Sequence, residues 1–115
     1  MQNLERSFYP LNRDKILSMI SIAAKAGKVA SGEYSVDHEG KAGNAKLVIL
    51  AEDASKRTIK SVSDMCEYYH IEYKIYGTKD SLGKTIGKEN RSQLAILDEG
   101  LAGSILNLIR ASQEE

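Results

Sequence analysis

The stretch LVILAEDAS, Leu47 to Ser55, decides the fold of this 115-residue chain. Its first five residues, 47–51, form a short continuous apolar run with β-branched side chains, which is typical of a strand buried on both faces. Ser55 is a residue type that caps helices, so the chain should pass from this strand straight into a helix. Glu52 and Asp53 stand between the two elements. Two carboxylates at the end of a buried strand indicate a candidate functional site.

Strands and helices are expected to alternate along the rest of the chain as well. The helix that Ser55 begins carries Ile59, Val62 and Cys66 at helical spacing. The predicted strands are residues 28–30, 47–51, 72–76 and 93–97, and the predicted helices are residues 13–26 (capped by Asn12), 33–42, 55–70, 79–87 and a last helix capped by Asp98. This order predicts an α/β fold in which helices cover both faces of a small sheet.

Length and composition limit the architecture to one domain. A chain of 115 residues with 42% hydrophobic and 28% charged residues fits a single globular core. We expect an N-terminal extension over residues 1–10 and one domain over residues 11–112. No apolar run approaches the ~18 residues that span a membrane, and the first ten residues lack a basic-then-apolar leader pattern, so a cytoplasmic protein is predicted.

The formal net charge is zero, with 16 basic and 16 acidic residues. This balance argues against a strongly basic nucleic-acid-binding domain. The charges are spread unevenly, however, with bases in excess over residues 11–30 and 54–91 and acids in excess over residues 31–53 and 92–115. A neutral chain of this kind can present a basic surface opposite an acidic one.

The segment GTKDSLGKT, Gly77 to Thr85, is similar to a phosphate-binding loop because it follows a predicted strand, opens a helix and ends in Gly-Lys-Thr. That motif needs four residues between its glycines so that backbone N–H groups wrap around the phosphates. Here five residues, Thr78 to Leu82, separate them. Leu82 also suits the apolar side of a helix that has already begun. We therefore reject a nucleotide site at Lys84 as the main interpretation and keep it as a rival.

Other catalytic chemistry has little support in the sequence. The two histidines, His38 and His70, and the single Cys66 lack the spacing of a metal finger, and one cysteine cannot form an intramolecular disulfide. Cys66 lies on the apolar stripe of its helix, which favours a buried structural thiol over a nucleophile. Glu52 and Asp53 point to opposite sides on an extended chain, and one of them can interact with the dipole of the helix that follows directly. We expect no enzyme, no metal, no cofactor and no small-molecule substrate.

Three motifs occur in one register along the chain. They are AAKAGK followed by SGE (residues 23–33), AKLVILAED (45–53) and LGKTIG (82–87). Together they resemble the ribosomal L-seven-Ae family of kink-turn RNA-binding proteins, and within it the bacterial YlxQ-type branch. The resemblance covers residues 11–110 and implies a three-layer α-β-α sandwich with a small mixed four-stranded sheet, in agreement with the alternation predicted above.

The resemblance also implies RNA binding, without catalysis, at one end of the sandwich. Family members recognise a sharply bent RNA with tandem sheared G·A pairs, and RNA of this kind is chosen by shape and backbone more than by sequence. The implied residues lie in the turn after the first strand and the helix it opens, in the Glu-Asp turn, and before the last strand. They are Gly32, Glu33, Tyr34, Ser35, His38, Glu52, Asp53, Lys79, Lys88, Asn90 and Arg91.

The turn after the first strand departs from the family pattern G-x-N-E-x-x-K. Tyr34, Ser35 and His38 stand where the family has Asn, Glu and Lys. A hydroxyl at position 35 accepts a guanine N–H more weakly than a carboxylate does, and His38 is mostly neutral at pH 7. Glu33, one residue before these positions, is the alternative acceptor.

Each implied side chain also has a plain structural interpretation. Lys79, Lys88 and Arg91 are by default solvated charges, although their shared place at one loop end favours phosphate contact. Tyr34 fits stacking on a base and half-burial about equally well. Phosphate contact and a solvated helix face remain equally good interpretations for the bases after Ser55, which are Lys56, Arg57 and Lys60.

The expected function is therefore a non-catalytic, cytoplasmic and monomeric protein that binds kinked, G·A-pair-containing RNA, such as ribosomal RNA, and that is associated with the ribosome or translation. The alternative is a family member with eroded kink-turn specificity that acts as a protein-interaction module on the translation machinery. The zero net charge and the departures in the turn motivate this alternative.

Overall fold

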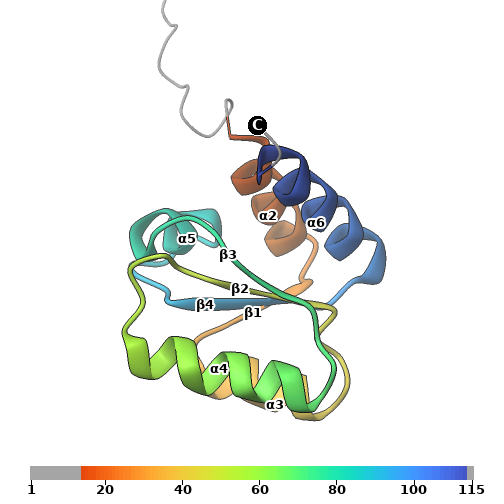
Figure 1. Cartoon of the computed structure of the whole chain (residues 1–115). Helices are drawn as coiled ribbons and strands as arrows, with labels where there is room; N and C mark the ends of the chain where they lie inside the picture. The colour runs from red at the N-terminus through yellow and green to blue at the C-terminus, as the bar shows by residue number, and fades with distance from the viewer. Residues whose placement is uncertain (1–13, 114–115) are drawn as a thin grey trace, which may run out of the picture.

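The computed structural model describes residues 14–113, which form five helices and four strands in alternation (Figure 1). The alternation predicted from the sequence is confirmed. In chain order the elements are α2 (Lys15–Lys25), β1 (Val29–Ser31), α3 (Glu33–Lys41), β2 (Leu47–Leu50), α4 (Lys56–Tyr68), β3 (Tyr73–Ile75), α5 (Lys79–Thr85), β4 (Gln93–Ile96) and α6 (Glu99–Gln113).

The predictions for the N-terminus fall partly outside the described residues, since the extension over residues 1–10 and the predicted cap Asn12 both lie there. The cap of α2 is instead Asp14, whose Oδ1 accepts a hydrogen bond from the backbone N–H of Leu17 at 2.9 Å. The prediction of Asn12 as cap is therefore wrong, because the helix begins at Lys15 and a carboxylate stands directly before it. The predicted caps Ser55 and Asp98 are confirmed.

The four strands form one mixed sheet in the order β1-β4-β2-β3. Strand β4 lies between β1 and β2 and runs antiparallel to both, whereas β2 and β3 are parallel. The register places Val48 of β2 opposite Ala95 of β4 on one side and Tyr73 of β3 on the other. All four residues of β2 are buried, as expected for a central strand covered on both faces.

Helices cover both faces of this sheet, which confirms the three-layer α-β-α sandwich (Figure 1). Successive side chains of a strand point to opposite faces, so Leu47 and Ile49 belong to one core and Val48 and Leu50 to the other. The first core packs against buried residues of α2, α5 and α6, which are Ile16, Leu17, Ile20, Leu82, Ala102, Ile105 and Ile109. The second packs against Val36 of α3 and against Val62 and Cys66 of α4.

Cys66 is a buried free thiol in the second core. Desolvation raises its pKa from 9.0 to about 11, with a smaller contribution from the charge of Glu67. Because the thiolate is the reactive form, a thiol with this pKa is inert near neutral pH. The prediction of a structural cysteine is confirmed.

The strand directions bring three helix N-termini to the same end of the molecule. Strands β1, β2 and β3 all run opposite to β4, so their carboxyl ends and the start of β4 lie at the same end of the sheet. Helices α3, α4 and α5 follow β1, β2 and β3 and therefore begin at that end of the sheet, which lies on the left in Figure 1. We call it the β-carboxyl end.

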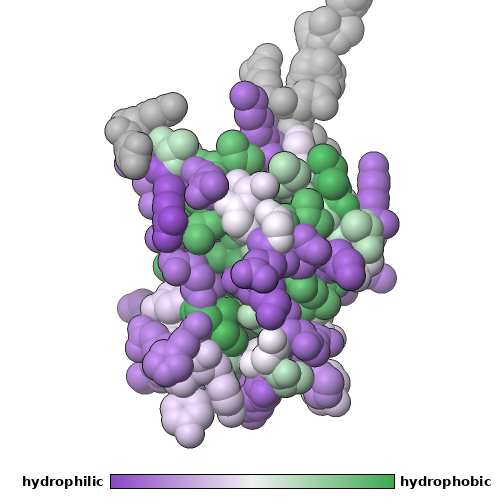
Figure 2. Space-filling model, turned by 90° about the vertical axis from the view of Figure 1, so that its right-hand side faces the viewer, coloured by the Kyte–Doolittle hydropathy of each residue, from purple (hydrophilic) through white to green (hydrophobic). Residues whose placement is uncertain are grey.

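The opposite end of the molecule has a different character. Figure 2 shows that more hydrophobic side chains reach the surface in the upper half, in the layer of α2 and α6, than in the lower half, where hydrophilic side chains dominate. Ile22 of α2 is 54% exposed. Within residues 14–113, no helix combines the length and the apolar character needed to cross a membrane.

Candidate nucleic-acid interface

Hydrogen bonds tie the loops of the β-carboxyl end into one surface. The backbone N–H of Arg91 donates to the carbonyl of Lys79 at 3.0 Å, and the N–H of Lys79 donates to Asp53 Oδ1 at 2.8 Å. On its other side, Arg91 places its Nε 3.4 Å from the hydroxyl of Ser31, next to Gly32. The structure therefore brings together four of the predicted residues: Gly32, Asp53, Lys79 and Arg91.

Gly32 sets the direction in which α3 leaves the sheet. It is the N-cap of α3 with φ +92° and ψ 165°, a conformation that residues with a Cβ rarely adopt. Its N–H donates to the carbonyl of Gln93 at 3.2 Å, which fixes the turn to the start of β4. Gly32 therefore serves the geometry of this turn.

The first two turns of α3 present an aromatic pair to solvent. The rings of Tyr34 and His38 stack with centroids 5.9 Å apart, and Tyr34 is 80% exposed. Nδ1 of His38 lies 3.9 Å from a carboxylate oxygen of Glu39. Ser35 is only partly exposed. The start of α3 therefore presents two stacked aromatic rings.

The side chain of Asp53 is bound to the start of helix α5. The sequence suggested that a carboxylate of the Glu-Asp turn interacts with the helix that follows directly, α4. The side chain of Asp53 accepts a hydrogen bond from the N–H of Lys79 at the start of α5. Strands β2 and β3 are adjacent and parallel, so the turn after one lies beside the turn after the other. Glu52 is exposed, and its backbone N–H donates to the carbonyl of Gly77 at 2.7 Å.

Replacing Asp53 with alanine should destabilise the fold by about 1 kcal/mol, because the N–H of Lys79 loses its acceptor and the start of α5 loses a compensating negative charge. Urea denaturation at pH 7 measures this change. The matched control is Glu52→Ala, which removes an adjacent carboxylate that forms no side-chain hydrogen bond within residues 14–113 and should shift stability by less than about 0.5 kcal/mol. Equal effects of the two substitutions would contradict the capping role.

The loop before β4 is held tightly against α5. The N–H of Lys88 donates to the carbonyl of Gly83 at 2.9 Å, and the Nη1 of Arg91 donates to the carbonyl of Asn90 at 2.8 Å. Gly83 has no side chain, and a Cβ added there would overlap the carbonyl oxygen of Glu89. The loop thus presents Lys88, Asn90 and Arg91 from a fixed backbone.

The same packing excludes the rival phosphate-loop interpretation of Gly83-Lys84-Thr85. Leu82 is fully buried, as expected for a helix that has already begun. The hydroxyl of Thr85 is buried and donates to the carbonyl of Leu82 at 2.6 Å, and Lys84 forms an ion pair with Asp80 at 3.1 Å. The three residues are therefore parts of helix α5 and do not form an open loop around a phosphate. Within residues 14–113, no three His, Cys, Asp or Glu side chains are grouped to hold a metal ion.

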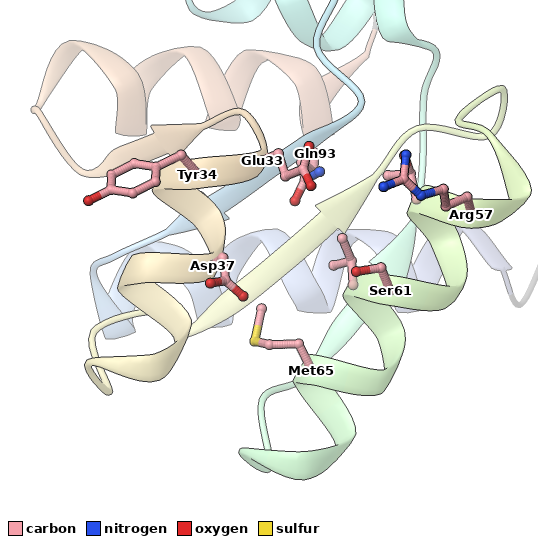
Figure 3. Close-up of a pocket in the computed structure, with 9 residues that line it drawn as sticks. Glu33, Tyr34, Asp37, Arg57, Ser61, Met65 and Gln93 are labelled. Atoms are coloured by element: carbon pink, nitrogen blue, oxygen red, sulfur yellow. The ribbon is translucent and has the colours of Figure 1, made fainter.

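A groove of about 610 Å³ opens between α3 and α4 beside the β-carboxyl end (Figure 3). Gln93, Glu33 and Arg57 line its upper part, and Figure 3 shows the guanidinium of Arg57 pointing from α4 toward the other two. The ring of Tyr34 points away from it. At its far end the two helices pack closely, since a Cβ added at Gly40 would lie 2.7 Å from the sulfur of Met65. We call this feature the α3–α4 groove.

Sequence reasoning assigned no role to Gln93. The sequence predicts Gln93 only as the first residue of an apolar strand. In the structure this polar residue is only 5% exposed, and a polar side chain buried to this extent needs an explanation. The sequence does not distinguish Arg57 from the other bases after Ser55. Its position differs from that of Lys60, which forms an ion pair with Asp64 along the exposed face of α4 at 3.0 Å.

The comparison with protein families matches residues 14–105 to the model of the ribosomal protein L7Ae/L30e/S12e/Gadd45 family. The match spans most of the chain. The chain belongs to this family.

Individual relatives are similar over nearly their whole length. The RNA-binding protein YlxQ of Bacillus subtilis (strain 168) is 43% identical over 91 residues, which cover 79% of this chain and 91% of that protein. A solved structure of a protein of unknown function from Bacillus halodurans has a TM-score of 0.81 and 35% identity, covering 84% of this chain and 97% of that one. The Giardia lamblia 15.5kD RNA binding protein has a TM-score of 0.70 at 20% identity, covering 96% and 94%, and supports the fold alone.

Proposed function

We propose that this chain is a non-catalytic protein that binds structured RNA through its β-carboxyl end. The observation that carries the proposal is the fixed placement of three bases there. Lys79, Lys88 and Arg91 come from two segments, and backbone hydrogen bonds to α5 hold them on one surface beside the start of α3. Bases held in this way attract phosphates without the entropy cost of ordering a flexible loop. Membership of the family and the similarity to YlxQ support RNA as the ligand.

We further propose that the RNA is kinked and contains G·A pairs, and that this chain contacts it differently from the family pattern. The stacked Tyr34 and His38 rings offer a face for a nucleobase or a sugar where the family has Asn and Lys. Glu33 in the first turn of α3 is exposed and supplies the carboxylate that Ser35 cannot. We propose that the chain acts as a monomer. It would be associated with ribosomal RNA or with the translation machinery in the cytoplasm, which fits these contacts.

Calorimetric titration with a kink-turn RNA tests the proposal. The matched control is the same RNA with its tandem G·A pairs replaced by Watson–Crick pairs, with both RNAs titrated at 0.1 M and 0.3 M salt. We expect at least tenfold tighter binding of the kink-turn RNA and a salt-dependent affinity for both. Equal affinities for the two RNAs would remove the kink-turn specificity, and no binding of either RNA would overturn the RNA-binding proposal.

A second candidate function is a protein-interaction module on the translation machinery. The observation that favours it is the exposed ring of Tyr34 near the start of α3, because tyrosine is enriched at protein interfaces. This candidate predicts partners that remain bound after nuclease treatment and that are lost on Tyr34→Ala substitution. An RNA-mediated association would instead disappear with the nuclease.

A further inference from the structure

The α3–α4 groove contains a buried side-chain amide that has no hydrogen-bond partner among residues 14–113. Gln93 is only 5% exposed, and its side chain lines the groove. Its carboxamide carries donors and an acceptor, yet it forms no hydrogen bond with any side chain or backbone group within residues 14–113. A buried polar group without a partner destabilises a protein, so an unpaired amide that faces an open groove indicates a missing ligand.

The groups around Gln93 define what that ligand must offer. Glu33 supplies a carboxylate that only accepts hydrogen bonds, and Arg57 supplies a guanidinium that only donates them. The second carboxylate of the lining, Asp37, is paired with Lys41 at 3.0 Å at the surface. With Asp37 paired to Lys41, the lining has one carboxylate, Glu33, and one guanidinium, Arg57, and therefore no excess positive charge for a phosphate. A planar, uncharged group with both donors and acceptors on its edges is complementary to it.

We propose that the α3–α4 groove binds a guanine base, with Gln93, Glu33 and Arg57 as its hydrogen-bonding partners. Guanine presents adjacent N1–H and N2–H donors, which suit a carboxylate, and adjacent O6 and N7 acceptors, which suit a guanidinium. Gln93 can donate to one acceptor and accept from one donor. Val62 and Met65 supply apolar contact for the ring, and Val62 belongs to the second core.

The other bases match this lining less well. Adenine has a single amino donor beside ring acceptors, and the Glu33 carboxylate would then face a lone pair. Uracil has an N3–H donor between its two carbonyl acceptors and so lacks adjacent acceptors for the guanidinium. Cytosine has adjacent N3 and O2 acceptors but a single donor group, its N4 amine, and so lacks the adjacent donor pair that suits the Glu33 carboxylate. The proposal deepens the proposed function, because an unstacked guanine of a bound RNA is one source of the base. A free guanine nucleotide is the other source, with its phosphate outside the groove.

The test titrates the full chain with GMP and AMP, and with two RNA hairpins that differ by one G or A in an unpaired loop. We expect at least tenfold tighter binding of the guanine member in one pair or both. Preference within the hairpins alone assigns RNA as the source, and preference within the nucleotides assigns the free nucleotide. No guanine preference in either pair overturns the proposal, whether or not the kink-turn RNA binds, so the groove and the proposed function fail separately.

Substitution of Gln93 separates a ligand role from a structural one. Gln93→Met keeps the side-chain length but removes the unpaired amide, so the free protein should gain about 4 °C or more in Tm while guanine binding falls about tenfold. Lower stability together with unchanged binding would overturn the proposal, because Gln93 would then be a structural residue.

Glu33→Gln is the second variant, and it changes an exposed residue whose loss should leave the fold intact. It should weaken guanine binding about tenfold. Binding of inosine, which lacks the N2 amine, should already be weak and should change less than that of guanine on the same substitution. An equal loss for guanine and inosine would show that Glu33 does not contact the amine.

Discussion

Gly83→Ala is expected to destabilise the protein by about 3 kcal/mol or more, which lowers Tm by about 12 °C or more for a domain of this size. The added Cβ would overlap the carbonyl oxygen of Glu89 and would lie 2.6 Å from its carbonyl carbon and 3.0 Å from the carbonyl oxygen of Lys88. These are backbone atoms, which cannot rotate away as a flexible side chain would. The whole segment before β4 would have to move away from α5.

The direction of this effect runs against helix propensity. Alanine in a helix interior is usually more favourable than glycine by about 0.5–1 kcal/mol. Gly83→Ala therefore lowers stability only if the steric cost of the added Cβ exceeds this gain in helix propensity. The overlap with the backbone of Glu89 makes the steric cost far larger than the gain. The loop carries Lys88 and Arg91, so RNA affinity should fall together with stability.

Gly103→Ala in α6 is the matched control, because no atom outside the neighbouring residues and the adjacent helix backbone lies within 4 Å of the added Cβ. It should leave stability unchanged or raise it by about 0.5–1 kcal/mol. Thermal denaturation of the wild type and both variants tests the pair. A Gly83→Ala protein as stable as the Gly103→Ala protein would show that α5 and the loop before β4 are not packed as described.

Simultaneous substitution of Lys79, Lys88 and Arg91 by alanine is expected to reduce affinity for structured RNA about 100-fold at 0.1 M salt. Each phosphate contact contributes roughly 0.7 to the slope of log affinity against log salt when the RNA is treated as single-stranded. Three contacts then account for an increase in affinity of about two powers of ten when the salt concentration falls from 1 M to 0.1 M. The curves of wild type and variant should accordingly converge near 1 M salt.

A control with the same charge change uses three exposed lysines near the opposite end of the sheet. Lys25 and Lys28 flank the turn between α2 and β1, and Lys46 directly precedes β2. Their triple alanine variant loses the same net charge but should reduce affinity less than about threefold at 0.1 M salt. Similar losses in the two triple variants would show that net charge drives binding and that the β-carboxyl end has no special role. Circular dichroism spectra establish that both variants are folded.

Local patterns in the sequence are sufficient to predict the helices and strands of this fold. The apolar run 47–51 and the caps Ser55 and Asp98 act through neighbours within about four residues, so periodicity and residue type predict them without any knowledge of the tertiary structure. The features that argue against a phosphate loop at residues 77–85 are also local. They are the spacing of its glycines and the apolar Leu82, which belongs to a helix that has already begun.

Only the tertiary structure decided which residues meet at the β-carboxyl end and which groups lack a partner. Asp53 accepts a hydrogen bond from Lys79, 26 residues away in sequence, because β2 and β3 are parallel neighbours. The side-chain amide of Gln93 has no hydrogen-bond partner within residues 14–113, because α3 and α4 leave a groove beside the start of β4. Strand order and helix packing set these contacts. Both depend on burying the two cores together, a property of the whole chain that no local stretch of sequence expresses.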